Sequence, residues 1–513
     1  MAASLYDAGG KAPNESIAST IAMNELDLSC GGLLPPIPRL EASPAIYDDR
    51  SESWSTREEL RSASLDLARA IASEHKRLVF LLCGVNSETI IGLLAAAAAG
   101  DATALIDPAL PEHLMTGLLE SYRPELILGA RGSFEKLPAA ASSSNATLGS
   151  APSRGGVVEW IARENNPSFP PIDPALQLLL STSGTTGSQK YVRLSRDAVV
   201  ANARQIAEAL AIDERSVGIA HLPLHYSYGL SVVTSHLVAG GRLCLVNDSI
   251  TSPSFWSKIG NVGGSHFPGV PFHYVALARL GAALVPDSVK TFTQAGGALD
   301  LRVQTKIRDW ATQRGGQFFV MYGQTEASPR MATLQHADHA RKAGSVGVAL
   351  AGGQFSIVDE HGAQLPADAV GTVVYEGPNV MLGYATSRAD LGNGDEMKGR
   401  LETGDLGRLD WEGFLYLTGR TKRFAKIAGY RLGLDEIERE LFAVCPVACL
   451  DLGEKIAVAH EQESETALKA RVRELADSYK VPSSSFALRK ITQIPRASSG
   501  KIDYARLKDL VSV

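Results

Sequence analysis

One stretch of the chain combines hydroxyls, glycines and a lysine in an order suited to holding phosphate. Residues 182–190 read Thr-Ser-Gly-Thr-Thr-Gly-Ser-Gln-Lys and follow the mostly apolar run 176–180. Glycines let a backbone curl so that its N–H groups point at phosphate oxygens. A Walker loop would need Gly-Lys-Ser/Thr, and a polar linker would have the same composition. The candidate phosphate contacts are Thr182, Ser183, Gly184, Thr185, Thr186, Gly187 and Lys190.

Two later segments carry carboxylates that suit a nucleotide and its cation. Residues 322–326 (Tyr-Gly-Gln-Thr-Glu) follow the strand-like run 317–321, and Glu326 is a ligand type that Mg²⁺ prefers. The carboxylate of Asp405, in Thr403-Gly-Asp405, can accept from two neighbouring ribose hydroxyls. The ordinary alternatives are a solvated surface glutamate and a common turn.

A third candidate is Lys501, which ends the loop Pro495-Arg-Ala-Ser-Ser-Gly-Lys near the C-terminus. A lysine placed between a carboxylate and a phosphate offsets the repulsion between two anions. An exposed loop lysine is the usual alternative.

Alternating helices and strands must position these residues. Residues 78–83 predict a buried strand, Ser87 can cap a helix through Ala99, and strands are expected at 104–106 and 126–128, with a helix after Pro111 between them. This β-α-β-α-β order predicts a parallel sheet with covering helices, and the rhythm resumes from 176 to about 350. Ligands then bind at the carboxyl ends of the strands.

The rest of the chain predicts a change of architecture. Residues 1–40 look irregular, and 138–156 predict a surface loop or local disorder. Residues 353–418 predict short strands of a β-subdomain, and a small α+β segment follows. The expected fold is α/β: a large N-terminal domain of parallel and mixed sheets with the β-subdomain (1–418), a hinge (419–422), and a small mobile C-terminal domain (423–513).

Composition excludes several classes of protein. The 513 residues are 45% hydrophobic and 21% charged, as in soluble proteins of two or more domains. A net charge of −6 argues against a nucleic-acid partner. Five cysteines fit reduced thiols better than disulfides or a metal site. The longest apolar run, 90–99, is half a membrane span, and no secretory signal is seen, so a cytoplasmic location is expected.

The segment 180–190 resembles the phosphate signature of the AMP-forming acyl-CoA synthetase superfamily, which includes luciferase and the adenylation domains of peptide synthetases. The usual form reads roughly S-G-T-T-G-x-P-K-G, and here Gln189 and Tyr191 replace the proline and the last glycine. Segments 322–326, 403–405, 419–420 and 495–501 resemble further superfamily motifs in the expected order. The resemblance covers roughly 45–513.

The resemblance implies roles for the nucleotide site. Tyr322 would pack on adenine, Thr325 would bond the α-phosphate, Glu326 would ligate Mg²⁺ and Arg420 would contact ribose and phosphate. Gly296, Gly297 and Ala298, with Gly323, would line the adenine and acyl pockets, although a plain turn would explain 294–298 equally well.

The resemblance also implies two half-reactions. Lys501 would be the catalytic lysine of adenylation. Lys422 would be the pivot about which the small domain rotates. Gly429, Tyr430 and Arg431 would then enter the site and shape the acceptor tunnel, with a simple turn as the alternative at Gly429.

The acid pocket departs from the family pattern. Residues 222–230 resemble L-P-L-F-H-x-x-G-L, so Tyr226 takes the place of the family histidine and His225 that of the aromatic residue before it, while Gly229 is retained. Gating and plain packing remain open for both. Gly323 stands where acetate-activating relatives have Trp, which favours a longer or aromatic acid.

The expected function is an AMP-forming carboxylate–CoA ligase that uses ATP, Mg²⁺ and CoA. Its partner is a small-molecule carboxylic acid, with no nucleic acid and no membrane span. The alternatives are an adenylating ligase that passes the acid to a carrier protein or an amine, and a nucleotide-binding homologue that has lost catalysis.

Overall fold

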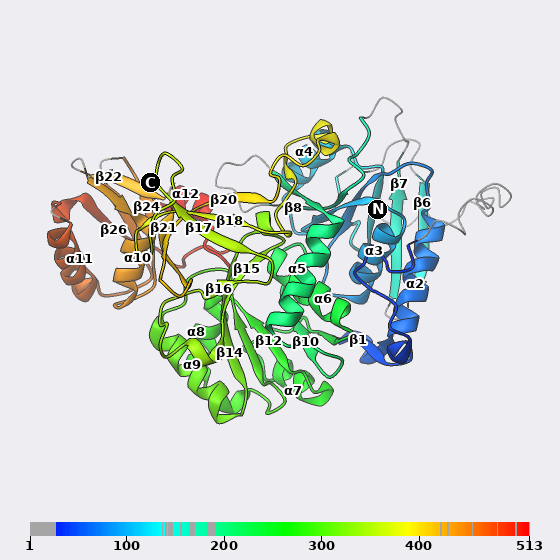
Figure 1. The fold of residues 1–513 in the computed structure, drawn as a ribbon, viewed down its shortest axis with the longest axis horizontal. Coiled ribbons are helices and arrows are strands. Elements are labelled where there is room, and N and C mark those ends of the chain that lie inside the picture. Colours follow the sequence, from blue (N-terminus) through cyan, green and yellow to red (C-terminus); the bar gives the residue numbers. More distant parts are fainter. Residues whose placement is uncertain are drawn as a thin grey trace, which may run out of the picture.

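The computed structural model describes residues 27–511 except 136, 139–140, 142–146, 154–155, 164–169, 182–189, 421–422, 428–429, 454, 480 and 498–499. Two large sheets, a smaller antiparallel sheet and a small C-terminal α+β unit follow one another along its length (Figure 1). The expected α/β fold is confirmed by this arrangement. Within the described ranges, no helix combines the length and the apolar composition that crossing a bilayer requires.

The first large sheet has eight strands with a parallel centre. Buried strands β4, β3 and β5 lie side by side, as the sequence predicts, and β8 joins them in parallel before the chain turns back through β9. The order is β19 (Gly383–Ala385), β9 (Tyr191–Ser195), β8 (Leu176–Ser181), β4 (Ala102–Ile106), β3 (Leu78–Leu82), β5 (Leu126–Ala130), β7 (Gly156–Ala162) and β6 (Thr147–Ser153).

The second large sheet has nine strands and carries the motif loops. Its central strands are parallel, and β15, β16 and β2 join antiparallel at the edges. The order is β16 (Val348–Ala349), β15 (Arg330–Leu334), β14 (Gln317–Gly323), β13 (Thr291–Gln294), β12 (His266–Gly269), β10 (Val217–Ala220), β11 (Arg242–Leu245), β1 (Pro44–Asp48) and β2 (Ser53–Thr56).

Helices fill the space between the two large sheets and cover the outer faces. Every residue of α3 is buried, which explains its alanine-rich, wholly apolar centre. Helices α5 and α6 pack on each other (Figure 1). Helix α5 contacts β8 and β9 of the first sheet and β15 of the second, and α6 contacts β10 and β11 of the second. The helices are α2 (Arg57–Ala70), α3 (Ser87–Ala98), α4 (Glu112–Tyr122), α5 (Arg196–Ala209), α6 (Ser227–Ala239), α7 (Pro253–Val262), α8 (Pro271–Leu280) and α9 (Leu301–Gln313).

The C-terminal part is smaller and has its own apolar clusters, whose members all come from residues 425–511. It follows the expected β-subdomain, a four-stranded sheet of β17 (Gln354–Val358), β18 (Gly371–Glu376), β20 (Arg400–Leu409) and β21 (Leu415–Arg420). It comprises β22 (Phe424–Ile427), β23 (Tyr430–Gly433), α10 (Leu434–Phe442), β24 (Val447–Asp451), β25 (Ile456–His460), α11 (Thr466–Ser478), β26 (Phe486–Lys490) and α12 (Tyr504–Val511).

Two local predictions were wrong. Residues 147–153, expected to be a loop, form β6, which pairs with β7 at the sheet edge. Its side chains are mostly exposed, so hydrogen bonds to β7 hold it without the apolar alternation that marks a strand. The cap of α3 is Asn86 instead of Ser87, because the Asn86 side chain accepts the backbone N–H of Thr89 at 2.8 Å.

Candidate active site

Two of the motif segments meet at the carboxyl ends of β13 and β14. These strands are parallel neighbours, with Gln294 opposite Val320. Gly296, Gly297 and Ala298 follow β13, while Tyr322 and Gly323 end β14 and a short 3-10 turn, Thr325–Ala327, comes next. The two loops therefore share one edge of the sheet, where such sheets bind ligands.

Asp405 lies in β20 and is held from two sides. Its Oδ1 accepts a 3.0 Å hydrogen bond from Nε of Arg420, and its Oδ2 accepts one from the hydroxyl of Tyr322. Gln324 reaches the same Oδ2 at 3.3 Å. Burial raises the pKa of Asp405 above its ordinary value, against the opposing effects of Arg420 and Tyr322. The result is an oriented, largely buried carboxylate suited to accept hydroxyl donors.

Tyr322 is part of the hydrogen-bond network around Asp405. Its hydroxyl bonds Asp405, and its ring lies 6.2 Å from the ring of Phe355 in β17. Packing of Tyr322 on adenine therefore remains a prediction. Sequence reasoning did not anticipate the bond between the two motifs, or Gln324 as a further donor.

Glu326 and Lys190 are linked through a residue that the sequence analysis missed. The hydroxyl of Tyr384, in β19, donates to Oε1 of Glu326 at 2.9 Å. Nζ of Lys190 lies 3.1 Å from the centre of the same ring, a cation–π contact. Strand β19 pairs with β9, which begins directly after Lys190. Only this pairing places Tyr384 in the site, and no local motif marks it.

A magnesium ion fits this arrangement only with help from the nucleotide. Among the described residues, no group of three or more His, Cys, Asp or Glu side chains is placed to hold a metal. Glu326 offers a single carboxylate, and Mg²⁺ at nucleotide sites takes few protein ligands, filling its shell with phosphate oxygens and water. The donor set is consistent with that mode.

Thr325 connects the turn after β14 to helix α6. Its Oγ1 lies 3.2 Å from Oγ of Ser227, the first residue of the helix. Ser227 is a further polar group that sequence reasoning did not select. The contact places the start of α6 beside the predicted α-phosphate site.

Lys501 reaches this site from the C-terminal part of the chain. Its Nζ lies 5.5 Å from the centre of the Tyr226 ring. Burial and the nearby charge of Arg420 lower the pKa of Lys501 below its usual 10.5, and Glu326 and Asp405 partly oppose that shift. The structure thus brings Lys501 next to Tyr226, which lies 275 positions (501 − 226) earlier in the sequence.

Two glycines allow the loops to approach each other. Gly500 has φ +78°, and a Cβ there would lie 2.9 Å from Cγ2 of Val270. Gly296 has φ +87°, and its Cβ would lie 2.5 Å from the Tyr226 hydroxyl. A side chain at Gly500 would push the C-terminal loop away from Val270, and one at Gly296 would push the β13 loop away from Tyr226.

The altered gate residues point to different partners. Nε2 of His225 lies 3.4 Å from Oδ2 of Asp107. Burial lowers the pKa of His225, against the effect of Asp107. Tyr226 instead faces Gly296 and Lys501. Their roles as gate or packing residues remain predictions.

Gly229 and Gly323 are required by close backbone approach. A Cβ on Gly229 would lie 2.8 Å from the carbonyl oxygen of Leu222. A Cβ on Gly323 would lie 2.9 Å from the carbonyl carbon of Pro329 and closer still to its oxygen. The pairing of β14 with β15 therefore requires a glycine at position 323 whatever the depth of the pocket. For this reason Gly323 is a poor guide to the length of the acid.

Several predicted residues lie outside what the structure describes. They are Thr182, Ser183, Gly184, Thr185, Thr186 and Gly187 of the phosphate loop, Lys422 of the hinge and Gly429. For Tyr430 and Arg431 only the backbone, within β23, is described.

Comparison with known proteins identifies the class to which this fold and site belong. The family model for AMP-binding enzymes matches residues 39–385, and the chain belongs to this family. Relatives include the 2-succinylbenzoate–CoA ligase of Bacillus cereus strain Q1, 28% identical over 65% of this chain and 70% of the relative. The medium-chain fatty-acid–CoA ligase of Escherichia coli K12 is 28% identical over 64% of this chain and 60% of the relative. The expected family is thereby confirmed.

Solved structures share the whole fold. An o-succinylbenzoate CoA synthetase from Bacillus subtilis, in complex with its acyl-adenylate intermediate, has TM-score 0.71 and 23% identity, covering 94% of this chain and 97% of that one. ATP-bound MatB from Rhodopseudomonas palustris has TM-score 0.73 and 21% identity, covering 94% and 99%. These similarities show that the fold is shared over 94% of the chain.

Proposed function

We propose that the protein is an AMP-forming carboxylate–CoA ligase. A carboxylate oxygen attacks the α-phosphorus of ATP, the bond to pyrophosphate breaks, and the acyl-AMP then transfers its acyl group to the thiol of CoA with release of AMP. The observations that carry the proposal are the electrostatic interaction of Lys501 with Asp405 and Glu326, which come from separate segments, its position 5.5 Å from the Tyr226 ring, and the membership of the chain in the AMP-binding family. The relatives named CoA ligases support the choice of acceptor.

In the first half-reaction each residue would have one task. Asp405 accepts the ribose hydroxyls, and Arg420 offsets its charge. Lys501 lies between the acid's carboxylate and the α-phosphate, where its charge lowers the barrier between two anions. Thr325 bonds the α-phosphate. Glu326 would hold Mg²⁺, which would supply charge neutralisation on the departing pyrophosphate.

Binding the phosphates would also use the charge of Lys190. Its ammonium lies on the face of Tyr384, whose hydroxyl bonds Glu326, so cation and carboxylate are held near each other by one ring. Thr182 to Gly187 would complete the cradle, as the sequence predicts. This assignment also argues for an active enzyme over a homologue that has lost catalysis.

The second half-reaction would follow rotation of residues 423–513 against 1–418 about 419–422. Arg420 is anchored on Asp405 of the larger part at 3.0 Å. Three positions later, Arg423 is anchored on Glu438 of the smaller part at 2.8 Å and stacks on Tyr504. Only residues 421 and 422 separate the two anchors, which supports a pivot at Lys422. Gly429, Tyr430 and Arg431 would then shape the CoA tunnel.

A cytoplasmic location is part of the proposal. All five cysteines are buried and none forms a disulfide, as expected of a protein kept in a reducing compartment.

The experiment is acid-dependent exchange of labelled pyrophosphate into ATP over a panel of carboxylic acids, repeated with CoA and read as thioester. Exchange with at least one acid and thioester with CoA are expected. Absence of exchange with every acid would overturn adenylation. Exchange without thioester would move the acceptor to a carrier protein or an amine.

A further inference from the structure

The side chain of Tyr384 contacts both of the charged residues that the proposed function assigns to the triphosphate and its cation. Its hydroxyl donates to Oε1 of Glu326 at 2.9 Å, and Nζ of Lys190 lies 3.1 Å from the centre of its ring. The ammonium therefore meets the face of the ring, while the carboxylate meets the hydroxyl at its edge. Because a phenol is neutral, it can orient both charged groups without neutralising either of them.

The hydroxyl of Tyr384 stays protonated at neutral pH. Burial, together with the negative charge of Glu326, raises the pKa of Tyr384 above its ordinary value. The proton therefore remains on the phenol oxygen and is directed at Oε1 of Glu326. No other side chain or backbone N–H in the described part of the chain donates to this carboxylate. Its second oxygen, Oε2, is thus open to a cation that arrives with the nucleotide.

The backbone of β19, which carries Tyr384, is fixed by side chains from the first large sheet and its covering helix. Arg193, in β9, is fully buried and donates from Nε to the carbonyl oxygen of Tyr384 at 3.1 Å. The same guanidinium is paired with Glu396 at 2.8 Å. The hydroxyl of Tyr122, at the end of α4, donates to the carbonyl oxygen of Ala385 at 2.8 Å. An aromatic side chain on a backbone held in this way is a rigid support for its contacts.

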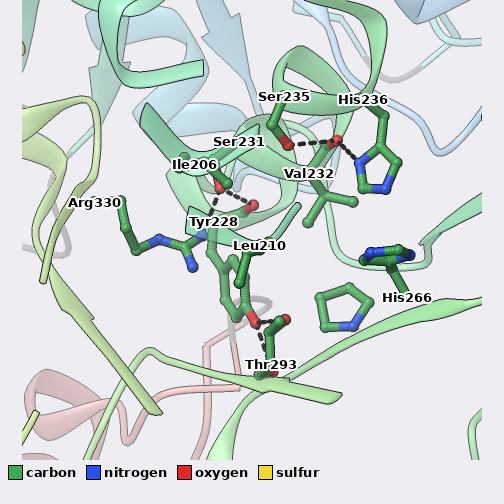
Figure 2. A pocket seen from close by; sticks show the side chains of 11 residues that line it. Ile206, Leu210, Tyr228, Ser231, Val232, Ser235, His236, His266, Thr293 and Arg330 are labelled. Atoms are coloured by element: carbon green, nitrogen blue, oxygen red, sulfur yellow. Dashed lines mark hydrogen bonds between the residues drawn. The ribbon is translucent and has the colours of Figure 1, made fainter. Parts of the chain in front are cut away.

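The backbone that carries Glu326 is held independently of Tyr384. Its carbonyl oxygen accepts the backbone N–H of Met381 at 2.9 Å, and the preceding residue, Thr325, contacts the first residue of α6. Helix α6 is tied to the second large sheet, where the hydroxyl of Tyr228 donates to the carbonyl oxygen of Thr293 (Figure 2). With the backbone fixed, the direction of the carboxylate is set by the hydrogen bond at Oε1.

We propose that Tyr384 is a positioning residue for adenylation, whose hydroxyl fixes Glu326 for the cation and whose ring fixes Lys190 for the phosphates. The inference rests on the proposed function and adds a residue to the same site. Without the hydroxyl the carboxylate can rotate, so binding of the cation must also order its ligand. Without the ring the long lysine side chain regains rotamer freedom, which binding of the phosphates must then remove.

Two variants separate the hydroxyl from the ring: Tyr384→Phe removes only the hydroxyl, and Tyr384→Leu removes both. The measurement is the Kd of ATP by isothermal titration calorimetry, with Mg²⁺ present and with EDTA in its place, without any acid. In Tyr384→Phe the Kd in EDTA should be unchanged and the Kd in Mg²⁺ should rise about 10-fold, the scale of losing a group that orients a metal ligand. In Tyr384→Leu the Kd in EDTA should also rise, by about 2- to 30-fold, as loss of a cation–π contact predicts.

Double variants distinguish positioning from a general structural role. Tyr384→Phe should have no further effect on the Kd in Mg²⁺ when Glu326 is already Gln. Tyr384→Leu should have no further effect on the Kd in EDTA when Lys190 is already Met, because residues that act as one unit are not additive. Tyr416→Phe and Tyr416→Leu are the matched controls: this tyrosine, in β21, has the guanidinium of Arg408 4.2 Å from its ring centre, and neither change should alter either Kd.

An effect of Mg²⁺ on the Kd that is equal in the wild type and in Tyr384→Phe overturns the role of the hydroxyl. An unchanged or tighter Kd in EDTA for Tyr384→Leu overturns the role of the ring, since tighter binding would mean that the ring competes with phosphate for Lys190. Additive losses in the double variants show a structural role and overturn both. If Tyr384→Leu fails to fold, Tyr384→Phe and its double variant decide the proposal. Absence of pyrophosphate exchange with every acid would instead reject the proposed function, which these binding measurements do not test.

Discussion

The hydroxyl of Tyr322 donates a hydrogen bond to the carboxylate of Asp405, 83 positions further along the chain. This bond joins the end of β14 in the second large sheet to β20 in the antiparallel sheet. Arg420 holds the other carboxylate oxygen. Asp405 is thus oriented by groups from both sides before any nucleotide arrives, which reduces the ordering cost of binding one.

Replacing Asp405 by Asn should weaken binding of ATP. The amide cannot accept two hydroxyls while Tyr322 and Arg420 keep their bonds, so the expected loss is about 1–3 kcal/mol, or roughly 5- to 150-fold in Kd. Isothermal titration calorimetry gives the measurement. The control is Asp368→Asn, at an exposed residue that pairs with Arg408. An unchanged Kd in Asp405→Asn would reject the ribose assignment.

Replacing Lys501 by Ala should slow adenylation by about 10²–10³-fold and leave ATP binding nearly intact, because the ammonium acts mainly in the transition state. Thioester formation from supplied acyl-AMP should survive. Pyrophosphate exchange and thioester release are measured separately. Lys508→Ala, at an exposed position of α12, serves as the control. Exchange near the wild-type rate in Lys501→Ala would show that this lysine has another role.

The lowered pKa of Lys501 predicts an alkaline limit to adenylation. Only the protonated ammonium carries the charge, so kcat/KM should fall as pH rises, with a midpoint below 10.5. Bound ATP adds negative charge and stabilises the ammonium, so the corresponding fall in kcat should occur at higher pH. The pH profile of exchange is the measurement.

Lys501→Arg provides the check on this assignment. A guanidinium stays protonated to about pH 12 or above, so any activity that the variant retains should lose the alkaline fall. A fall with the same midpoint in Lys501→Arg would assign the titration to another group.

Lys422→Pro should separate the two half-reactions. Proline fixes φ near about −65° and removes a backbone donor, so it tolerates one of the two domain arrangements better than the other. Retained exchange with depressed thioester formation is expected, since Lys501 already lies 5.5 Å from the centre of the Tyr226 ring and interacts electrostatically with Asp405 and Glu326. Rates equal to the wild type in both assays would mean that Lys422 is not the pivot.

Much of the fold could be predicted, because buried strands and helix ends follow from the pattern of neighbouring residues in the sequence. The buried strand β3 is a continuous apolar run and β8 a mostly apolar one, and α3, between β3 and β4, ends two residues before Gly100, which has φ +78°. The β6–β7 hairpin could not, because β6 is an exposed edge strand without apolar alternation. The pairing of an edge strand depends on the strand beside it, so the sequence of the edge strand itself shows little sign of it.

The site was predictable only where motifs mark it. The bond between Tyr322 and Asp405 joins two motifs through tertiary packing, and the position of Tyr384 depends on the pairing of β19 with β9.

The close approach of Gly500 to Val270 limits how far the C-terminal loop can shift before its packing against the large part of the chain changes. The gap there is narrower than one methyl group, since a Cβ would sit 2.9 Å from the valine side chain at a backbone φ of +78°. An alanine at position 500 would push the C-terminal loop away from the sheet by steric clash alone, without changing any charged group. The position of the Lys501 ammonium therefore depends on how closely the C-terminal loop packs against Val270. A single added carbon at position 500 would be enough to displace it.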